Sequence, residues 1–386
     1  MAKSYLAERV ASLKPSGIRK FFEIASTMKE VISLGIGEPD FNSPPAIVDA
    51  GIKSLREHKT HYTSNRGIMP LREALSQHIE NLYKVSYSPK DDIVITVGGS
   101  EALVIACNAI LNPGDEVILP TPCFVSYQGV ITLAGGVSVE IPCRMKNNFM
   151  PDPEELEKAV TNKTKAILIN FPNNPTGAVA DKETLIAIGK IAEKHDLIVI
   201  SDEIYDRLVY GVEHVCFAAL PGMRDRTILI GGFSKDYAMT GWRIGFVCAP
   251  TSIMQGVARV HQYIIMTAPT MAQYGALEGL LSCEDDVQKM IIEYDRRRKI
   301  IVEGLNYIGL PTFEPRGAFY AFPKVSVTGL DDEEFSERLL QEKHVAVVPG
   351  SAFGPAGKGF VRCSYATSFD QIEEALDRID QFVKSL

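Results

Sequence analysis

The chain has 386 residues, of which 46% are hydrophobic and 23% are charged, and its formal net charge is -8 at pH 7. This length and composition predict a globular protein with enough hydrophobic residues for two domains, each with its own core. The negative charge argues against nucleic acid and against an anionic membrane surface as partners.

The cysteines and histidines suggest a reduced protein without a structural metal. Seven cysteines are spread along the chain, mostly inside apolar runs: Cys107, Cys123, Cys143, Cys216, Cys248, Cys283 and Cys363. This distribution is typical of core cysteines in a cytosolic protein. The histidines form no HExxH pattern, so no metal is expected. Because we find no signal peptide and no apolar run near the roughly 20 residues of a membrane span, we expect a cytoplasmic location without membrane contact.

From about residue 90, short apolar runs typical of buried strands alternate with helical patterns. The predicted strands are residues 92–97, 116–120, 137–142, 165–170, 196–205, 227–233 and 242–247. Residues 152–160 and 182–195 are amphipathic, with acidic first turns and basic last turns, as helix ends prefer. This alternation predicts an α/β fold with a mostly parallel sheet flanked by crossover helices.

The pattern changes after a long predicted helix at residues 284–308. The following segments are GAFYAFP (317–323), a helical pattern at 331–344, VAVVPG (345–350), FVRCSYA (360–366) and a final helix from Phe369 onward. We interpret this part as a smaller α+β domain. We expect a large domain at residues 48–278 and a small domain formed by residues 1–47 and 279–386.

Two cations lie just after a predicted core strand, in the stretch GGFSKDYAMTGWRIGF. Lys235 follows the run 227–233, and Arg243 comes eight residues later. A single lysine is most often a solvated surface residue. A lysine at the end of a core strand that faces a crevice, however, can act as a base or as a nucleophile.

Other polar residues follow strands in the same way. Gly98, Gly99 and Ser100 begin a helix, where free backbone N–H groups bind phosphate, although this is also an ordinary turn sequence. Asn174 lies in a turn and could donate to a ligand oxygen. Asp202 leaves an apolar run, and a buried carboxylate needs a partner such as a cationic ring nitrogen.

The order of these features matches the requirements of pyridoxal 5'-phosphate (PLP). The chain resembles the class I aminotransferases of PLP fold type I along nearly its whole length. The resemblance rests on the segments SLGIGEPDF, HYTSNRGIMPLREAL, NNPTGAV, SDEIY, SKDYAMTGWRIGF, GAFYAFP, VAVVPGSAFG and VRCSYATS. The chain is most similar to the aspartate and aromatic aminotransferases of thermophilic bacteria and archaea.

The resemblance implies roles at the cofactor ring. Lys235 would hold the cofactor aldehyde as a Schiff base, and Asp202 would pair with the pyridine nitrogen. Asn174 and Tyr205 would bind the 3-oxygen of the ring, and Phe124 would stack on it. Lys235, Asp202 and Tyr205 are therefore the expected catalytic residues.

The resemblance also implies the phosphate site and a homodimer. The expected phosphate ligands are the backbone of Gly99, Ser100 and Glu101, the side chains of Ser234 and Arg243, and Tyr62 from a second subunit. One departure is visible, because many relatives carry a serine where this chain has Gly232. Either Ser234 does more in this chain, or one hydrogen bond to phosphate is missing.

By the same resemblance, Arg362 would bind the substrate carboxylate together with Gly37 and Asn174, since a planar guanidinium fits a carboxylate with two hydrogen bonds. Some aspartate-active relatives use a lysine where this chain has Ser100. We therefore consider Arg66, entering from the other subunit, as the partner of a distal carboxylate; an exposed loop arginine is the alternative.

The resemblance implies an aminotransferase that moves an amino group from an aromatic, bulky apolar or aspartate substrate to a 2-oxo acid such as 2-oxoglutarate, with ping-pong kinetics. A PLP-dependent β-lyase or an aminocyclopropane-forming enzyme on the same fold is an alternative, and a non-catalytic PLP-sensing module is another. A nicotinamide dehydrogenase is disfavoured because the first strand-turn-helix lacks the glycine fingerprint.

Overall fold

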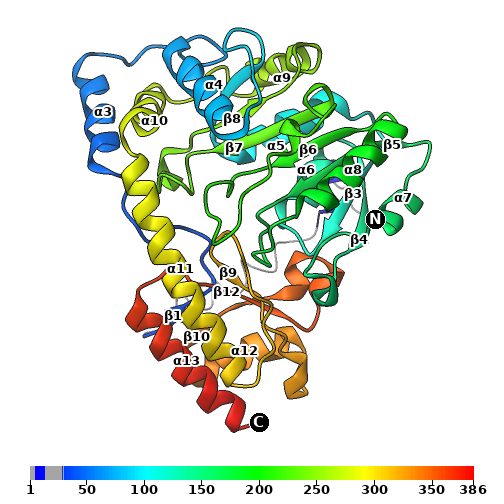
Figure 1. Cartoon of the computed structure of the whole chain (residues 1–386), viewed down its shortest axis with the longest axis vertical. Helices are drawn as coiled ribbons and strands as arrows, with labels where there is room; N and C mark the ends of the chain where they lie inside the picture. The colour runs from blue at the N-terminus through cyan, green and yellow to red at the C-terminus, as the bar shows by residue number, and fades with distance from the viewer. Residues whose placement is uncertain (1–4, 14–27, 29) are drawn as a thin grey trace.

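The computed structural model describes residues 5–13, 28 and 30–386, and a seven-stranded sheet lies at its centre (Figure 1). The strand order is β2-β8-β7-β6-β5-β3-β4. The strands are β2 (Ile93–Thr96), β3 (Glu116–Thr121), β4 (Val137–Pro142), β5 (Thr164–Asn170), β6 (Ile198–Asp202), β7 (Thr227–Gly232) and β8 (Gly245–Cys248). Within this sheet only β8 runs opposite to the other strands. The predicted α/β fold with a mostly parallel sheet is confirmed.

Helices cover both faces of the sheet, which explains why its strands are continuous apolar runs. One face packs on α5 (Gly98–Ile110), α6 (Ser126–Leu133) and α9 (Thr251–Ile264). The other face packs on α3 (Pro45–Arg56), α4 (Met69–Tyr83), α7 (Pro153–Lys158), α8 (Lys182–Lys194) and α10 (Thr270–Ser282). Neighbouring residues such as Ile167 and Leu168 therefore enter different cores, as the alternation of side chains along a strand requires.

The long helix α11 (Glu284–Tyr307) leads from α10 to a second group of elements, drawn in orange and red in Figure 1. There β9 (Tyr320–Ala321), β11 (Val348–Pro349) and β12 (Val361–Ser364) form an antiparallel sheet. Helices α12 (Asp332–Lys343) and α13 (Phe369–Lys384) pack with α11 around a shared aromatic core. The short strand β1 (Ile32–Ser33) pairs with β10 (Val345–Ala346) and joins the N-terminal segment to this group.

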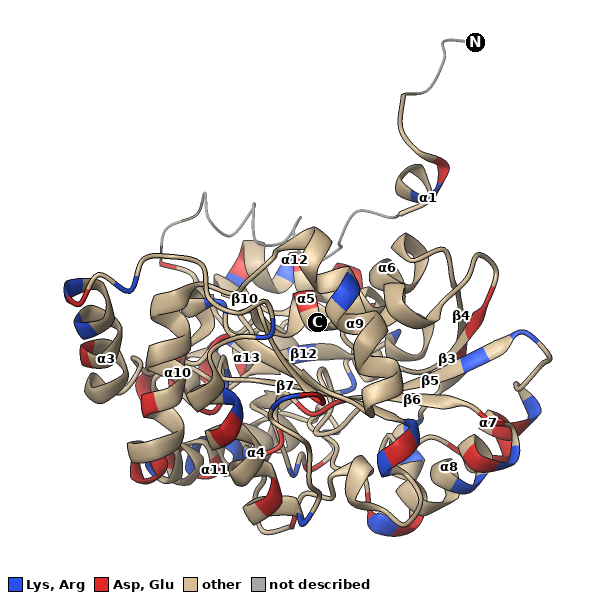
Figure 2. Cartoon of the chain, turned by 90° about the horizontal axis from the view of Figure 1, so that it is seen from above, with Lys and Arg blue, Asp and Glu red and all other residues tan. Residues whose placement is uncertain are grey.

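The N-terminal helix and the cysteines differ in their exposure to solvent. The short helix α1 (Glu8–Ala11) lies beside α6 at the margin of the described structure, with Tyr5 95% exposed (Figure 2). All seven cysteines are free and buried, as predicted for core residues.

In the described part of the chain, no helix is long and apolar enough to cross a membrane. The same residues contain no cluster of three or more side chains that could hold a metal ion.

Candidate active site

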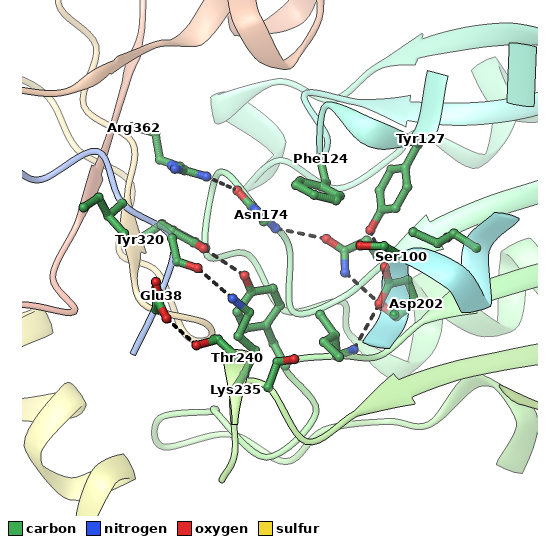
Figure 3. Close-up of a pocket in the computed structure, with 18 of the residues that line it drawn as sticks. Glu38, Ser100, Phe124, Tyr127, Asn174, Asp202, Lys235, Thr240, Tyr320 and Arg362 are labelled. Carbon is green, nitrogen blue, oxygen red and sulfur yellow. Dashed lines mark hydrogen bonds between the residues drawn. The ribbon is translucent and has the colours of Figure 1, made fainter. Parts of the chain in front are cut away.

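A cavity of about 540 Å³ opens where the carboxyl ends of the central strands face β9, β12 and the segment after β1 (Figure 3). Most site residues predicted from the sequence line this cavity: Gly37, Gly99, Ser100, Phe124, Asn174, Asp202, Tyr205, Ser234, Lys235, Arg243 and Arg362. These residues come from distant parts of the sequence. Several of them lie at strand ends of the central sheet, because parallel strands end at the same edge, whereas Gly37 follows β1 and Arg362 lies on β12.

Asp202 ends strand β6 and lies buried at the floor of the cavity. Its Oδ2 accepts a hydrogen bond from the Tyr127 hydroxyl at 2.8 Å, and its Oδ1 accepts one from the Ile204 backbone N–H at 3.1 Å. Burial raises the pKa of Asp202 to about 6, although both hydrogen bonds oppose this effect. A cationic ligand at this position would favour the ionised carboxylate.

Lys235 follows β7 and faces the segment after β1. Its Nζ donates to the Gly37 carbonyl at 2.6 Å and lies 5.7 Å from the centre of the Tyr205 ring. Burial lowers the pKa of Lys235 to about 8, and the nearby positive charge of Arg362 contributes. A substantial neutral fraction of this amine is therefore present near pH 8, as proton transfer and nucleophilic attack both require.

The start of α5 forms a cradle beside Arg243. Gly98 has φ +69°, and a Cβ built there would lie 2.9 Å from Arg243 Nη2, so the close approach favours glycine. The backbone N–H groups of the first helical turn have no partners within the helix and can bind an anion. Arg243 also donates from Nη1 to the Thr240 carbonyl at 2.9 Å.

The side chain of Glu101 points away from the cavity. Its Oε2 accepts from the Val97 backbone N–H at 2.5 Å, and its Oε1 lies 2.6 Å from Nδ1 of the buried His261. Glu101 is not among the residues that line the cavity. Only the backbone of Glu101, at the start of the helix, is therefore left for the predicted role in phosphate binding.

The space beside Gly232 is occupied. A Cβ built on this residue would lie 2.7 Å from Cδ1 of Ile204, which lines the cavity. A serine at position 232 would therefore require Ile204 to move. The glycine noted in the sequence is accounted for by this packing.

Arg362 marks the opposite end of the cavity. It lies on β12, and its Nη1 and Nη2 donate to Asn174 Oδ1 at 2.8 Å and to the Gly35 carbonyl at 2.7 Å. Its guanidinium lies 4.4 Å from the centre of the Tyr320 ring, and its Nε is buried without a hydrogen-bond partner in the described part of the chain. Arg362 is therefore a buried cation that could bind an anionic ligand.

Two residues singled out in the sequence do not reach the cavity of their own chain. Tyr62 is 80% exposed, and Arg66 Nη1 donates to the Asp91 carbonyl at 2.7 Å. Neither residue lines the cavity. Their suggested roles depend on a second subunit and remain predictions.

Sequence reasoning missed several residues that line the cavity, among them Glu38, Tyr127, Ile204 and Tyr320. Tyr127 lies three residues after Phe124, so its position near the cavity was open to prediction from this spacing. Glu38 and Tyr320 belong to the motifs SLGIGEPDF and GAFYAFP, which we used only for the resemblance.

The sequence model of the family described as "Aminotransferase class I and II" matches residues 29–379. The chain belongs to this family. Aspartate aminotransferase from Pyrococcus abyssi is 47% identical, and aromatic-amino-acid aminotransferase 2 from Thermococcus litoralis is 45% identical, each over 98% of both chains. The crystal structure of an aromatic aminotransferase from Pyrococcus horikoshii superposes with a TM-score of 0.91 at 44% identity, covering 95% of this chain and 99% of that one.

The chain is therefore a PLP-dependent aminotransferase of fold type I, whose substrates are amino acids and 2-oxo acids. Its cavity contains groups that fit this cofactor. An anion cradle, a buried carboxyl and a lysine with a lowered pKa lie together. These features are the partners that the phosphate, the ring nitrogen and the aldehyde of PLP need.

Proposed function

We propose that this aminotransferase accepts aromatic, bulky apolar and acidic amino acids and passes the amino group to 2-oxoglutarate or a similar 2-oxo acid in a ping-pong cycle. The observation that carries the proposal is that Lys235 and Arg362 line the same cavity together with several apolar side chains. Arg362 would bind the α-carboxylate that all these substrates share. Ile36, Leu103 and Phe124 offer apolar surface to the substrate side chain.

The roles of the cofactor-binding residues follow from their positions. Asp202 would face the ring nitrogen, and Phe124 would stack on the ring. Tyr205 and Asn174 would donate to the 3-oxygen; because Asn174 Oδ1 already accepts from Arg362, its amide Nδ2 is left for this bond.

The phosphate would be bound by the start of α5 and by the side chains around it. Its proposed ligands are the backbone of Gly99, Ser100 and Glu101 with the side chains of Ser234 and Arg243. Tyr62 of a second subunit would complete the set. Since Ile204 fills the space next to Gly232, Ser234 is the hydroxyl that this part of the chain offers.

Lys235 is the proposed acid and base of the reaction. When bound, PLP supplies an electron sink for the amino acid. The Lys235 amine would take the proton from Cα of the substrate and then return a proton at the cofactor carbon, and its lowered pKa increases the fraction able to accept a proton. The first 2-oxo acid leaves before the second enters, which is the basis of ping-pong kinetics.

A homodimer would complete the site, and the exposed apolar side chains near Tyr62 support it. Tyr263 is 84% exposed, and the residues after it, Ile264 and Met266, are 49% and 46% exposed. Asn65 Nδ2 donates to the Met266 carbonyl at 2.7 Å, so this segment and the loop after Tyr62 form one surface. Exposed apolar patches of this kind mark interaction sites.

Two further predictions belong to this proposal. We propose that residues 48–278 form the large domain and that residues 1–47 and 279–386 form the small one, which the pairing of β1 with β10 supports. We also propose a cytoplasmic location, in keeping with seven free and buried cysteines.

A panel of amino donors against 2-oxoglutarate tests the proposed substrates. We expect turnover of phenylalanine or tyrosine as well as glutamate and aspartate. Turnover of aspartate alone would contradict the broad specificity. Release of pyruvate from cysteine conjugates without amino transfer would instead favour a β-lyase.

A further inference from the structure

Two tyrosines from different parts of the molecule join their hydroxyl groups inside the cavity (Figure 3). Tyr205 follows β6 of the central sheet, and Tyr320 begins β9 in the second group of elements. Their hydroxyl oxygens are 2.8 Å apart, and both side chains are buried. Tyr320 has no role in the function described so far.

Either hydroxyl can donate in this hydrogen bond, and its direction decides which hydroxyl proton stays free. Two hydroxyls carry two protons, and only one of them is used in the bond between the two tyrosines. No other described residue accepts from either hydroxyl. A Cβ built on Gly37 would lie 2.5 Å from the Tyr320 hydroxyl oxygen, so the glycine at this position leaves room for the hydroxyl. If Tyr320 donates in this bond, the proton that stays free is that of Tyr205, and it can point to a ligand in the cavity.

The ring of Tyr320 has a second contact, with Arg362. The guanidinium lies 4.4 Å from the ring centre, in the range of a cation–π interaction. Tyr320 and Arg362 lie on the neighbouring strands β9 and β12. One side chain therefore contacts both the tyrosine at the cofactor end and the arginine at the substrate end.

We propose that Tyr320 is a positioning residue with two separable parts. Its hydroxyl donates to Tyr205 and so directs the Tyr205 proton at the ligand, and its ring holds the Arg362 guanidinium in place for a carboxylate. This inference rests on the proposed function, in which Tyr205 donates to the 3-oxygen of PLP and Arg362 binds the amino acid. A donor that is itself hydrogen-bonded in this way is a stronger donor.

Two variants of the PLP-loaded enzyme separate the role of the Tyr320 hydroxyl from that of the Tyr320 ring. Tyr320→Phe removes the hydroxyl only, and Tyr320→Leu removes the ring as well. Tyr365→Phe is the matched control, because Tyr365 is equally buried, donates to the Ala318 carbonyl at 3.2 Å and does not line the cavity. For each protein we would titrate the absorbance of the bound cofactor with pH and take the pH at the midpoint of the change. We would also measure kcat and KM for phenylalanine.

In Tyr320→Phe we expect the midpoint to rise by roughly 0.3 to 1 pH unit, with KM nearly unchanged. The rise is expected because Tyr205, without the Tyr320 hydroxyl, is a weaker donor to the 3-oxygen of PLP. A weaker donor stabilises the deprotonated form of the bound cofactor less. Tyr320→Leu should show the same rise and a KM higher by roughly 2- to 30-fold, the range of a cation–π contact. Tyr365→Phe should change neither quantity.

A third variant, Tyr205→Phe, separates failure of this inference from failure of the proposed function. If Tyr205→Phe raises the midpoint and Tyr320→Phe does not, the role of the Tyr320 hydroxyl is overturned and that of Tyr205 stands. If neither variant changes the midpoint, the proposed role of Tyr205 is overturned together with that of Tyr320. Thermal unfolding of each variant shows whether it is folded, and the Phe variants keep the test valid if Tyr320→Leu is not.

Discussion

The two ends of the cavity are built in different ways. At the cofactor end, Asp202 ends β6 and Lys235 lies shortly after the end of the neighbouring strand β7, so adjacent strands of one sheet carry both residues. At the substrate end, Arg362 is held by the Gly35 carbonyl, which lies 327 positions away in the sequence.

The difference suggests that the two ends of the cavity serve different functions. Groups fixed by the sheet are suited to chemistry, which is the same for every amino acid, because their geometry does not depend on the substrate. Groups held by contacts between separate segments are suited to recognition. Substitutions at the cofactor end should therefore lower the rate with all donors, whereas substitutions at the substrate end should change KM and the choice of donor.

The largest effect is expected for Lys235→Ala. Removing the amine that moves the proton should lower kcat/KM by roughly 10⁴-fold or more with every donor, while PLP still binds through its phosphate and ring contacts. Steady-state rates and cofactor absorbance measure the two properties. Lys289→Ala is the control, since this side chain is 74% exposed. Substantial activity, or a cofactor still covalently bound after borohydride reduction, would refute the assignment.

Asp202→Asn tests the other group at the cofactor end. It removes the charge that would keep the ring nitrogen protonated and leaves the size of the side chain unchanged, so kcat should fall by roughly 10²- to 10⁴-fold. The free energy of unfolding, measured in denaturant, should change far less, because the amide oxygen of the new side chain can still accept a hydrogen bond. A variant with normal rates would return Asp202 to a purely structural role.

Arg362→Lys should show the opposite pattern at the substrate end. A lysine keeps the charge but cannot form two parallel hydrogen bonds with a carboxylate. We expect kcat/KM to fall roughly 30- to 1,000-fold, mainly through KM, and similarly for phenylalanine and glutamate. A loss confined to kcat would contradict the contrast between the two ends.

The smallest effect is expected for Arg66→Ala, and only with one class of substrate. If Arg66 of a second subunit binds a distal carboxylate, its removal should cost about 1.5 to 3 kcal/mol in kcat/KM for glutamate and little for phenylalanine. Phenylalanine is thus the internal control. Equal losses for both substrates, or no loss for either, would place Arg66 outside the site and leave its hydrogen bond to Asp91 as its role.

The sequence predicted the cofactor end better than the substrate end. Lys235 and Asp202 were found because each directly follows an apolar run, and a strand end is visible in local sequence. The direction of β8 was not predicted, because apolar runs do not indicate the sense in which a strand pairs. The pairing of Tyr320 with Tyr205 spans 115 positions, and the filling of the space at Gly232 by Ile204 depends on packing between β7 and the turn after β6. Such contacts have no local pattern.

The distance in sequence between Gly35 and Arg362 also affects the order in which the protein acquires its properties during translation. The last strand of the central sheet, β8, ends at Cys248, so the residues of the cofactor end have all been synthesised long before Arg362. A nascent chain at that stage contains Asp202, Lys235 and Arg243 but not yet Arg362, which donates to the Gly35 carbonyl. The growing chain therefore gains the group proposed to recognise the amino acid only after the groups of the cofactor end.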